Sequence, residues 1–149
     1  MDAEKYIKGL RDKLVDSKNW KSITISRVWT NKFPSDAGVY AFKEKGKIVY
    51  VGETGNLRGR MNDLLDSRHH TIRRTIGERL FSKIKGFKKA TNKAKFPNHI
   101  EKRVNKHICN NLKIAHLPVP LGRKELEEFI ESEIPKELRL NKRGKRKKK

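Results

Sequence analysis

The chain has 149 residues, with 38 lysines and arginines against 17 aspartates and glutamates; its formal net charge of +21 predicts a polyanionic partner such as nucleic acid. Its single cysteine, Cys109, excludes an intramolecular disulfide, and no Cys/His set has the spacing of a zinc site. The sequence contains neither a secretory leader pattern nor an apolar run long enough to cross a bilayer, so we expect a soluble cytoplasmic protein without a membrane role.

The first predicted element is an amphipathic helix over residues 3–15, where apolar side chains recur every three or four positions. A short strand is then indicated by Ile23 and Ile25 and, less regularly, by Val28 and Trp29. Residues 31–38 contain proline, aspartate and glycine and predict a loop. We therefore expect residues 1–36 to form an N-terminal extension of one helix and one strand.

Two β-prone runs follow, over residues 38–42 and 48–51, and a polar stretch containing Gly46 joins them. This pattern predicts a β-hairpin. If the turn is centred near Lys45, Tyr40 and Tyr50 are direct cross-strand neighbours on one face of the sheet.

Asn56 is a candidate N-cap for a helix with Leu57, Met61, Leu64 and Leu65 on its inward side. Steps of four between apolar residues predict two further helices, around residues 72–80 and 100–108. The lysine-rich stretch between them, residues 82–97, is expected to be a flexible connection.

Residues 113–120 alternate as a strand does, and residues 123–134 have the period of a last helix. Seven of the last eight residues, 142–149, are basic, which predicts a disordered arm that neutralises phosphates. The order of elements predicts a small α/β (α+β) domain with an antiparallel core sheet.

Two triplets stand in the hairpin, Gly38-Val39-Tyr40 and Tyr50-Val51-Gly52, and Asn56-Leu57 and Arg60 follow them. With these residues the chain resembles the GIY-YIG nuclease family over residues 38–141. The resemblance implies a three-stranded antiparallel sheet flanked by helices, with the nuclease domain at residues 37–141. It also implies an endonuclease that hydrolyses DNA phosphodiester bonds with Mg²⁺ or Mn²⁺.

The resemblance assigns roles to three side chains of the first half. One of the phenols of Tyr40 and Tyr50 deprotonates or orients the attacking water, and the other bonds the water or the phosphate; which is the base stays open. Arg60 is expected to clamp the scissile phosphate. Arg58 flanks the other side of the same helical stripe, so geometry alone does not choose between them, and the family spacing selects Arg60.

In the last helix, the Leu-Glu pair of the family falls on Glu127, which we expect to be catalytic and to hold the metal. Glu127 lies at the edge of the inward face whereas Glu128 points away, and Glu131 is the second choice. Asn141 matches the closing asparagine of the family and is expected to orient the site; a turn or capping role is the alternative. A lone carboxylate suits Mg²⁺, which keeps several waters.

A basic cluster after the Arg60 helix is expected, together with Arg58, to bind nucleic acid; its members are His69, His70, Arg73 and Arg74. A histidine there could also act as a second acid or base. The alternative function is a non-catalytic basic RNA- or DNA-binding protein. The sequence leaves open whether the DNA substrate is branched or site-specific. It also leaves open whether a homodimer or a partner protein supplies the specificity.

Overall fold

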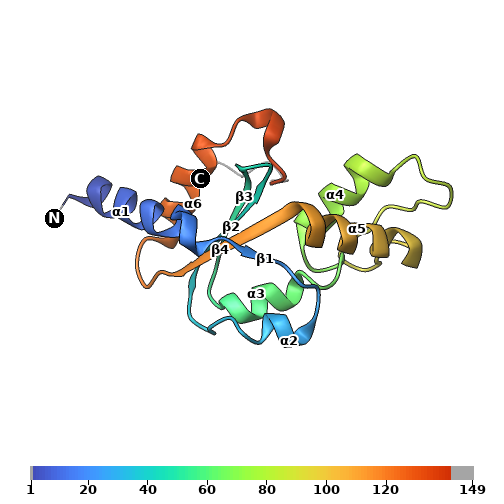
Figure 1. Ribbon diagram of the computed structural model, residues 1–149, viewed down its shortest axis with the longest axis horizontal. Helices are drawn as coiled ribbons and strands as arrows, with labels where there is room; N and C mark the ends of the chain where they lie inside the picture. The colour runs from blue at the N-terminus through green and yellow to red at the C-terminus, as the bar shows by residue number, and fades with distance from the viewer. Residues whose placement is uncertain (1, 142–149) are drawn as a thin grey trace.

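A computed structural model describes residues 2–141 of the chain (Figure 1). The elements in chain order are α1 (Ala3–Val15), η1 (Ser17–Asn19), β1 (Lys21–Ser22), α2 (Arg27–Thr30), β2 (Gly38–Glu44), β3 (Lys47–Thr54), α3 (Leu57–Asp63), α4 (Thr71–Phe81), α5 (Asn98–Asn111), β4 (Leu112–Pro118), α6 (Arg123–Glu133) and η2 (Lys136–Leu138). The mixed fold with an antiparallel sheet between helices confirms the predicted class. The predicted disordered arm lies outside the described residues.

The sheet has four strands in the order β1-β4-β2-β3, rather than the three that were expected, and all neighbours are antiparallel. The additional strand is β1, which pairs Lys21 with Ile114 at the edge. The prediction for residues 23–29 was wrong, because Val28 and Trp29 lie in α2. The Ser26 side chain accepts the backbone N–H of Trp29, and this cap starts a helix where the apolar pattern indicated a strand.

The β2–β3 hairpin turns through Lys45 and Gly46, both with positive φ (52° and 78°). Glu44 pairs with Lys47, but a register shift follows, so that Tyr40 pairs with Gly52. Tyr50 is paired with Phe42, and the prediction that the two tyrosines are directly opposite was wrong. They are diagonal neighbours instead. Without the extra residue in β3, Tyr40 and Tyr50 would point to opposite faces of the sheet.

Each face of the sheet has its own apolar core. The face that carries Tyr40, Phe42 and Tyr50 packs on the helices α3, α4 and α5. The face that carries Val39, Ala41 and Val51 packs on α1 and α6. Figure 1 shows α1 and α6 near one end of the molecule and the α4–α5 pair near the other. The described N-terminal residues thus join the same body, and a division at residue 37 stays a prediction.

The lysine-rich connection between α4 and α5 is packed, contrary to the expectation of a loose linker. Phe96 and Ala90 are buried in the core. Gly77 in α4 leaves the room that Phe96 fills, because a Cβ at Gly77 would lie 2.3 Å from the Phe96 ring. The side chain of Thr91 accepts the backbone N–H groups of Lys93 and Ala94, which closes a turn. The segment therefore has its own fixed shape.

Candidate active site

The hydroxyl of Tyr40 lies at the centre of a buried hydrogen-bond network. Tyr40 is 1% exposed. Its Oη accepts from Nε of Arg60 over 3.1 Å, and Nε2 of His70 lies 3.0 Å away. Tyr40 lies on β2, Arg60 lies on α3, and His70 directly precedes α4. Three parts of the fold therefore meet at one oxygen.

The structure determines which ring nitrogen of His70 carries the proton. Nδ1 accepts the backbone N–H of Ile72, so it bears no hydrogen, and the neutral ring must carry its proton on Nε2. His70 therefore donates to Tyr40. Burial, followed by the charges of Arg60 and two further arginines, holds the pKa of His70 well below its usual value, which keeps the ring neutral.

Burial raises the pKa of Tyr40 well above that of a free phenol, and the neighbouring Tyr50 raises it further. The charge and hydrogen bond of Arg60 act in the opposite direction without reversing the shift. Tyr40 is accordingly a neutral phenol at physiological pH. A phenol oxygen that already accepts from Arg60 and His70 takes part in any further hydrogen bond as the donor.

Tyr50 completes an aromatic group around this network. Its ring stacks on that of Tyr40, with centroids 6.0 Å apart and planes 28° apart, and lies 5.5 Å from the ring of His70. The β3 register shift makes this contact, since it turns Tyr50 to the face of Tyr40. The structure thus brings both predicted tyrosines together.

The two glycines of the sequence triplets make room for this arrangement. A Cβ on Gly52 would lie 2.4 Å from the Oη of Tyr40, so the phenol crosses directly over the β3 backbone. A Cβ on Gly38 would lie 2.4 Å from the carbonyl oxygen of Leu117 and 2.7 Å from the side chain of Leu57. These positions require glycine because of close approach, and neither has a positive φ.

Arg60, and not Arg58, reaches Tyr40. Its Nη1 donates to Oδ2 of Asp63 and to the carbonyl oxygen of His69, and its side chain is 25% exposed. Burial lowers the pKa of Arg60, but its charge interaction and hydrogen bond with Tyr40 more than offset this and raise it. Arg58 is exposed and donates from Nε to the carbonyl oxygen of Phe33 instead. The choice that the family spacing made therefore agrees with the geometry.

Helix α6 runs antiparallel to β3 on the other face of the sheet. Near its start, Arg123 donates to the carbonyl oxygen of Thr54, and near its end Ile134 lines a cavity together with Ile48. Glu127 follows Arg123 by one turn and is 8% exposed, which agrees with the inward position predicted for it. Glu128 is exposed. The rise per residue of a helix and of a strand places the turn of α6 that carries Glu127 beside the part of β3 around Val51.

Asn141 bonds the outer edge of β3. Its Nδ2 donates to the carbonyl oxygen of Val51 over 2.8 Å, and its Oδ1 accepts the N–H of the same residue over 3.2 Å. The backbone N–H of Leu140 donates to the carbonyl oxygen of Val49. Asn141 thus holds the strand that carries Tyr50 and Gly52, and its role in orienting the site stays a prediction.

Two of the predicted nucleic-acid contacts are inside the protein. His70 and Arg73 are fully buried, and Arg73 pairs with Glu101 over 3.0 Å. Arg74 donates to the carbonyl oxygens of Ser67 and Arg68. His70 and Arg73 therefore act within the fold. The feature of the sequence that could have indicated a structural role for His70 is its place at the start of the helical pattern, two residues before Ile72.

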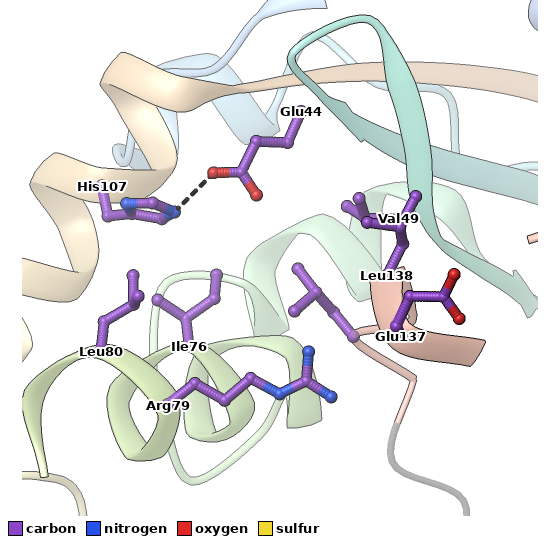
Figure 2. Close-up of a pocket in the computed structure, with 9 residues that line it drawn as sticks. Glu44, Val49, Ile76, Arg79, Leu80, His107, Glu137 and Leu138 are labelled. Carbon is purple, nitrogen blue, oxygen red and sulfur yellow. Dashed lines mark ion pairs between the residues drawn. The ribbon is translucent and has the colours of Figure 1, made fainter. Parts of the chain in front are cut away.

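A separate cavity of about 200 Å³ opens at the turn end of the hairpin (Figure 2). Glu44 and His107 face each other across it, with 3.3 Å between Oε2 and Nε2, and Arg79 and Leu138 lie on its wall. None of the predicted catalytic side chains lines this cavity.

Within residues 2–141, no three His, Cys, Asp or Glu side chains gather as a metal cluster. A metal at Glu127 would thus have at most two such side chains from the described residues and would complete its shell with waters and phosphate oxygens. Mg²⁺ binds in this way, so the donor set fits it. In the same part of the chain, no helix is both long enough and apolar enough to cross a membrane.

The family model of the GIY-YIG catalytic domain matches residues 20–147. The chain belongs to this family and contains a nuclease domain of the GIY-YIG type. No curated protein and no solved structure matches the chain. The match begins just before β1, so it includes β1 and α2, which lie in the region predicted as an N-terminal extension outside the domain.

Proposed function

We propose that the protein is an endonuclease that hydrolyses DNA phosphodiester bonds with the help of a divalent cation. The observation that carries this proposal is the phenol of Tyr40, which is held between Arg60 and His70 and crosses Gly52. A phenol required only for packing needs no such pair of donors. The other predicted catalytic residues, Glu127 and Asn141, belong to the elements that flank and edge the same strand.

Arg60 binds the scissile phosphate. Its guanidinium has five N–H donors, and the hydrogen bonds described above use Nε and Nη1. The side chain is partly exposed, so its outer donors can reach a phosphate oxygen. A permanent positive charge there opposes the negative charge that grows on phosphate during hydrolysis.

Tyr40 orients the attacking water and exchanges a proton with it. As a neutral phenol it can donate its O–H to the water, and as a phenolate it would be stabilised by the two donors that it already has. The raised pKa means that Tyr40 does not ionise in the free protein. Loss of its proton therefore requires positive charge that arrives with the substrate complex. Tyr50, stacked on Tyr40, bonds the water or the phosphate.

Glu127 is the residue that would hold the cation. When bound, Mg²⁺ or Mn²⁺ supplies positive charge to the phosphate oxygens. Asn141 keeps β3 in place through its two bonds to Val51. Arg58 and Arg74 are proposed to contact the nucleic acid backbone from the surface of the helices α3 and α4.

The second candidate function is a basic nucleic-acid-binding protein without catalysis, which the net charge of +21 favours. The two candidates differ in their need for Glu127. A binder without a cation gains nothing from a carboxylate beside the phosphate, because the like charges repel. A binder would therefore tolerate Glu127→Ala.

The deciding experiment incubates supercoiled plasmid with the protein in Mg²⁺, in Mn²⁺ or in EDTA. Tyr40→Phe, Arg60→Ala and Glu127→Ala are compared at concentrations where each still binds DNA. Cation-dependent nicking that all three variants lose supports the nuclease. Intact plasmid leads to the same assay on branched DNA, single-stranded DNA and RNA; inactivity on all four, with binding retained, would identify the non-catalytic binder.

A further inference from the structure

A strongly basic surface covers the end of the molecule that is formed by α5 and the segment between α4 and α5. Nine exposed lysines and arginines make up this surface, which we call the lysine platform: Lys83, Lys85, Lys88, Lys89, Lys93, Lys95, Lys102, Arg103 and Lys106. None of the nine forms an ion pair with another described residue. Glu101, the acidic residue within this stretch, forms an ion pair with Arg73.

The segment that carries much of the platform is packed against the domain and is not an unstructured run of charges. Phe96 packs on Gly77 and against the ring of Phe87, with centroids 5.6 Å apart, which anchors the segment to α4. A surface groove runs beside Phe96, and Lys88, Lys89 and Lys95 are among the residues that line it. A fixed groove with several cations binds a chain of phosphates at less entropic cost than free lysines do.

The platform is also joined firmly to the candidate active site. His70 caps α4 and bonds Tyr40, and Arg60 bonds the backbone of His69. Arg73 links α4 to α5 through Glu101. The phosphate site at Arg60 and the lysine platform thus belong to one rigid unit.

The length of α4 gives how far the platform extends from the candidate active site. The near part of the platform lies beside the first turns of α4, where Glu101 pairs with Arg73 and Phe96 packs on Gly77. The helix spans 11 residues and runs from the residue after His70 to the lysine-rich segment, so it covers about 16 Å. At about 3.4 Å per base pair, this corresponds to roughly five base pairs of duplex. Figure 1 shows the segment at the tip of the α4–α5 pair, away from the sheet.

We propose that the lysine platform binds the sugar-phosphate backbone of a duplex arm that extends at least about five base pairs from the bond aligned at Arg60. This proposal rests on the proposed function for the position of that bond. The substrate is then a nucleic acid with a double-stranded arm on one side of the cleaved bond. The platform contributes affinity and orientation and has no part in the chemical step.

The test measures binding by fluorescence anisotropy with the full chain carrying Glu127→Gln, so that no cleavage occurs. Two duplexes are used, with arms of about four and about sixteen base pairs, which end short of and beyond the far end of the platform. The platform variant combines Lys88→Gln, Lys89→Gln and Lys95→Gln. A matched control removes the same charge from the N-terminal region with Lys5→Gln, Lys13→Gln and Lys18→Gln. A second platform variant carries Lys102→Gln, Arg103→Gln and Lys106→Gln.

We expect both platform variants to bind the long-arm duplex at least about tenfold more weakly and to lose about 2 to 3 from the slope of log affinity against log salt. Their affinity for the short-arm duplex should fall by a smaller factor. Equal losses in the platform and control variants, or equal losses on both duplexes, would overturn the proposal. Plasmid cleavage by chains that retain Glu127 is measured separately, so arm-length-dependent binding without cleavage would refute the nuclease and leave the platform.

Discussion

His70 donates its Nε2 proton to the hydroxyl of Tyr40 across 3.0 Å, while its Nδ1 accepts the backbone N–H of Ile72 in the first turn of α4. A single buried side chain thus begins a helix and orients the central phenol of the site. The helix cap fixes the ring tautomer, and the tautomer fixes the direction of the hydrogen bond. The local folding of α4 is therefore coupled to the state of Tyr40.

Tyr40→Phe should abolish DNA cleavage while the fold is retained. The substitution keeps the ring packing on Tyr50 but leaves the buried Nε2–H of His70 without an acceptor, which should cost about 1–3 kcal/mol of stability. Plasmid nicking and urea denaturation measure the two effects. If Tyr40→Phe cuts plasmid at the wild-type rate, Tyr40 is a packing residue.

His70 should make stability depend on pH. Its pKa is lowered in the folded protein, so below about 6.5 the unfolded chain binds a proton that the folded chain does not. The free energy of unfolding should therefore fall as pH drops below 6.5, with a limiting slope of about 1.4 kcal/mol per pH unit. His70→Gln should remove this part of the slope in denaturation series from pH 7.5 to 5.

His116→Gln is the matched control for that series. His116 also has a pKa lowered by burial, but it is only half-buried and lies on β4, opposite Tyr40. Its substitution should change the slope less than that of His70 does. An identical pH dependence in wild type and His70→Gln would show that His70 is not a buried neutral ring.

Gly52→Ala should displace the phenol of Tyr40, because the new methyl group would lie 2.4 Å from Oη. We expect a loss of about 1–3 kcal/mol in stability and a loss of cleavage. Gly9→Ala is the control: no atom lies within 4 Å of a Cβ there, and the exposed helical position should gain about 0.5–1 kcal/mol. Thermal unfolding and nicking assays distinguish the two. Normal activity in Gly52→Ala would contradict the need for the phenol to cross β3.

Glu127→Gln should lose cleavage at every Mg²⁺ concentration, since the amide keeps the shape of the side chain but supplies no negative charge for a cation. Glu128→Gln, one residue away on the exposed side of α6, should retain it. EDTA should stop the wild-type and Glu128→Gln proteins equally. Should the two variants behave alike, Glu127 does not hold the cation, and Glu131 becomes the next candidate.

Local patterns allowed most of the elements to be predicted. The spacing of apolar residues agrees with the observed helices α1, α3, α4, α5 and α6 to within a few residues. The burial of Glu127 followed from its place on the helical wheel. These features depend on neighbours within two turns of a helix, which the sequence displays directly.

Features that depend on distant contacts could not be predicted. The register shift in β3 places Tyr50 opposite Phe42, and a pattern of β-prone residues does not show where a strand takes up an extra residue. His70 and Arg73 looked like surface cations because their partners, Tyr40 and Glu101, are about thirty residues away in the chain. Phe96 likewise gave no sign that it would anchor the segment to Gly77.

The bonds from Leu140 and Asn141 to β3 also protect the sheet. An open edge strand offers its backbone groups to other chains and is a starting point for aggregation. Here the N–H and carbonyl of Val51 are taken by a side-chain amide, which imitates the backbone of a neighbouring strand. A chain shortened before residue 140 should therefore tend to self-associate through β3, even where the rest of the domain stays folded.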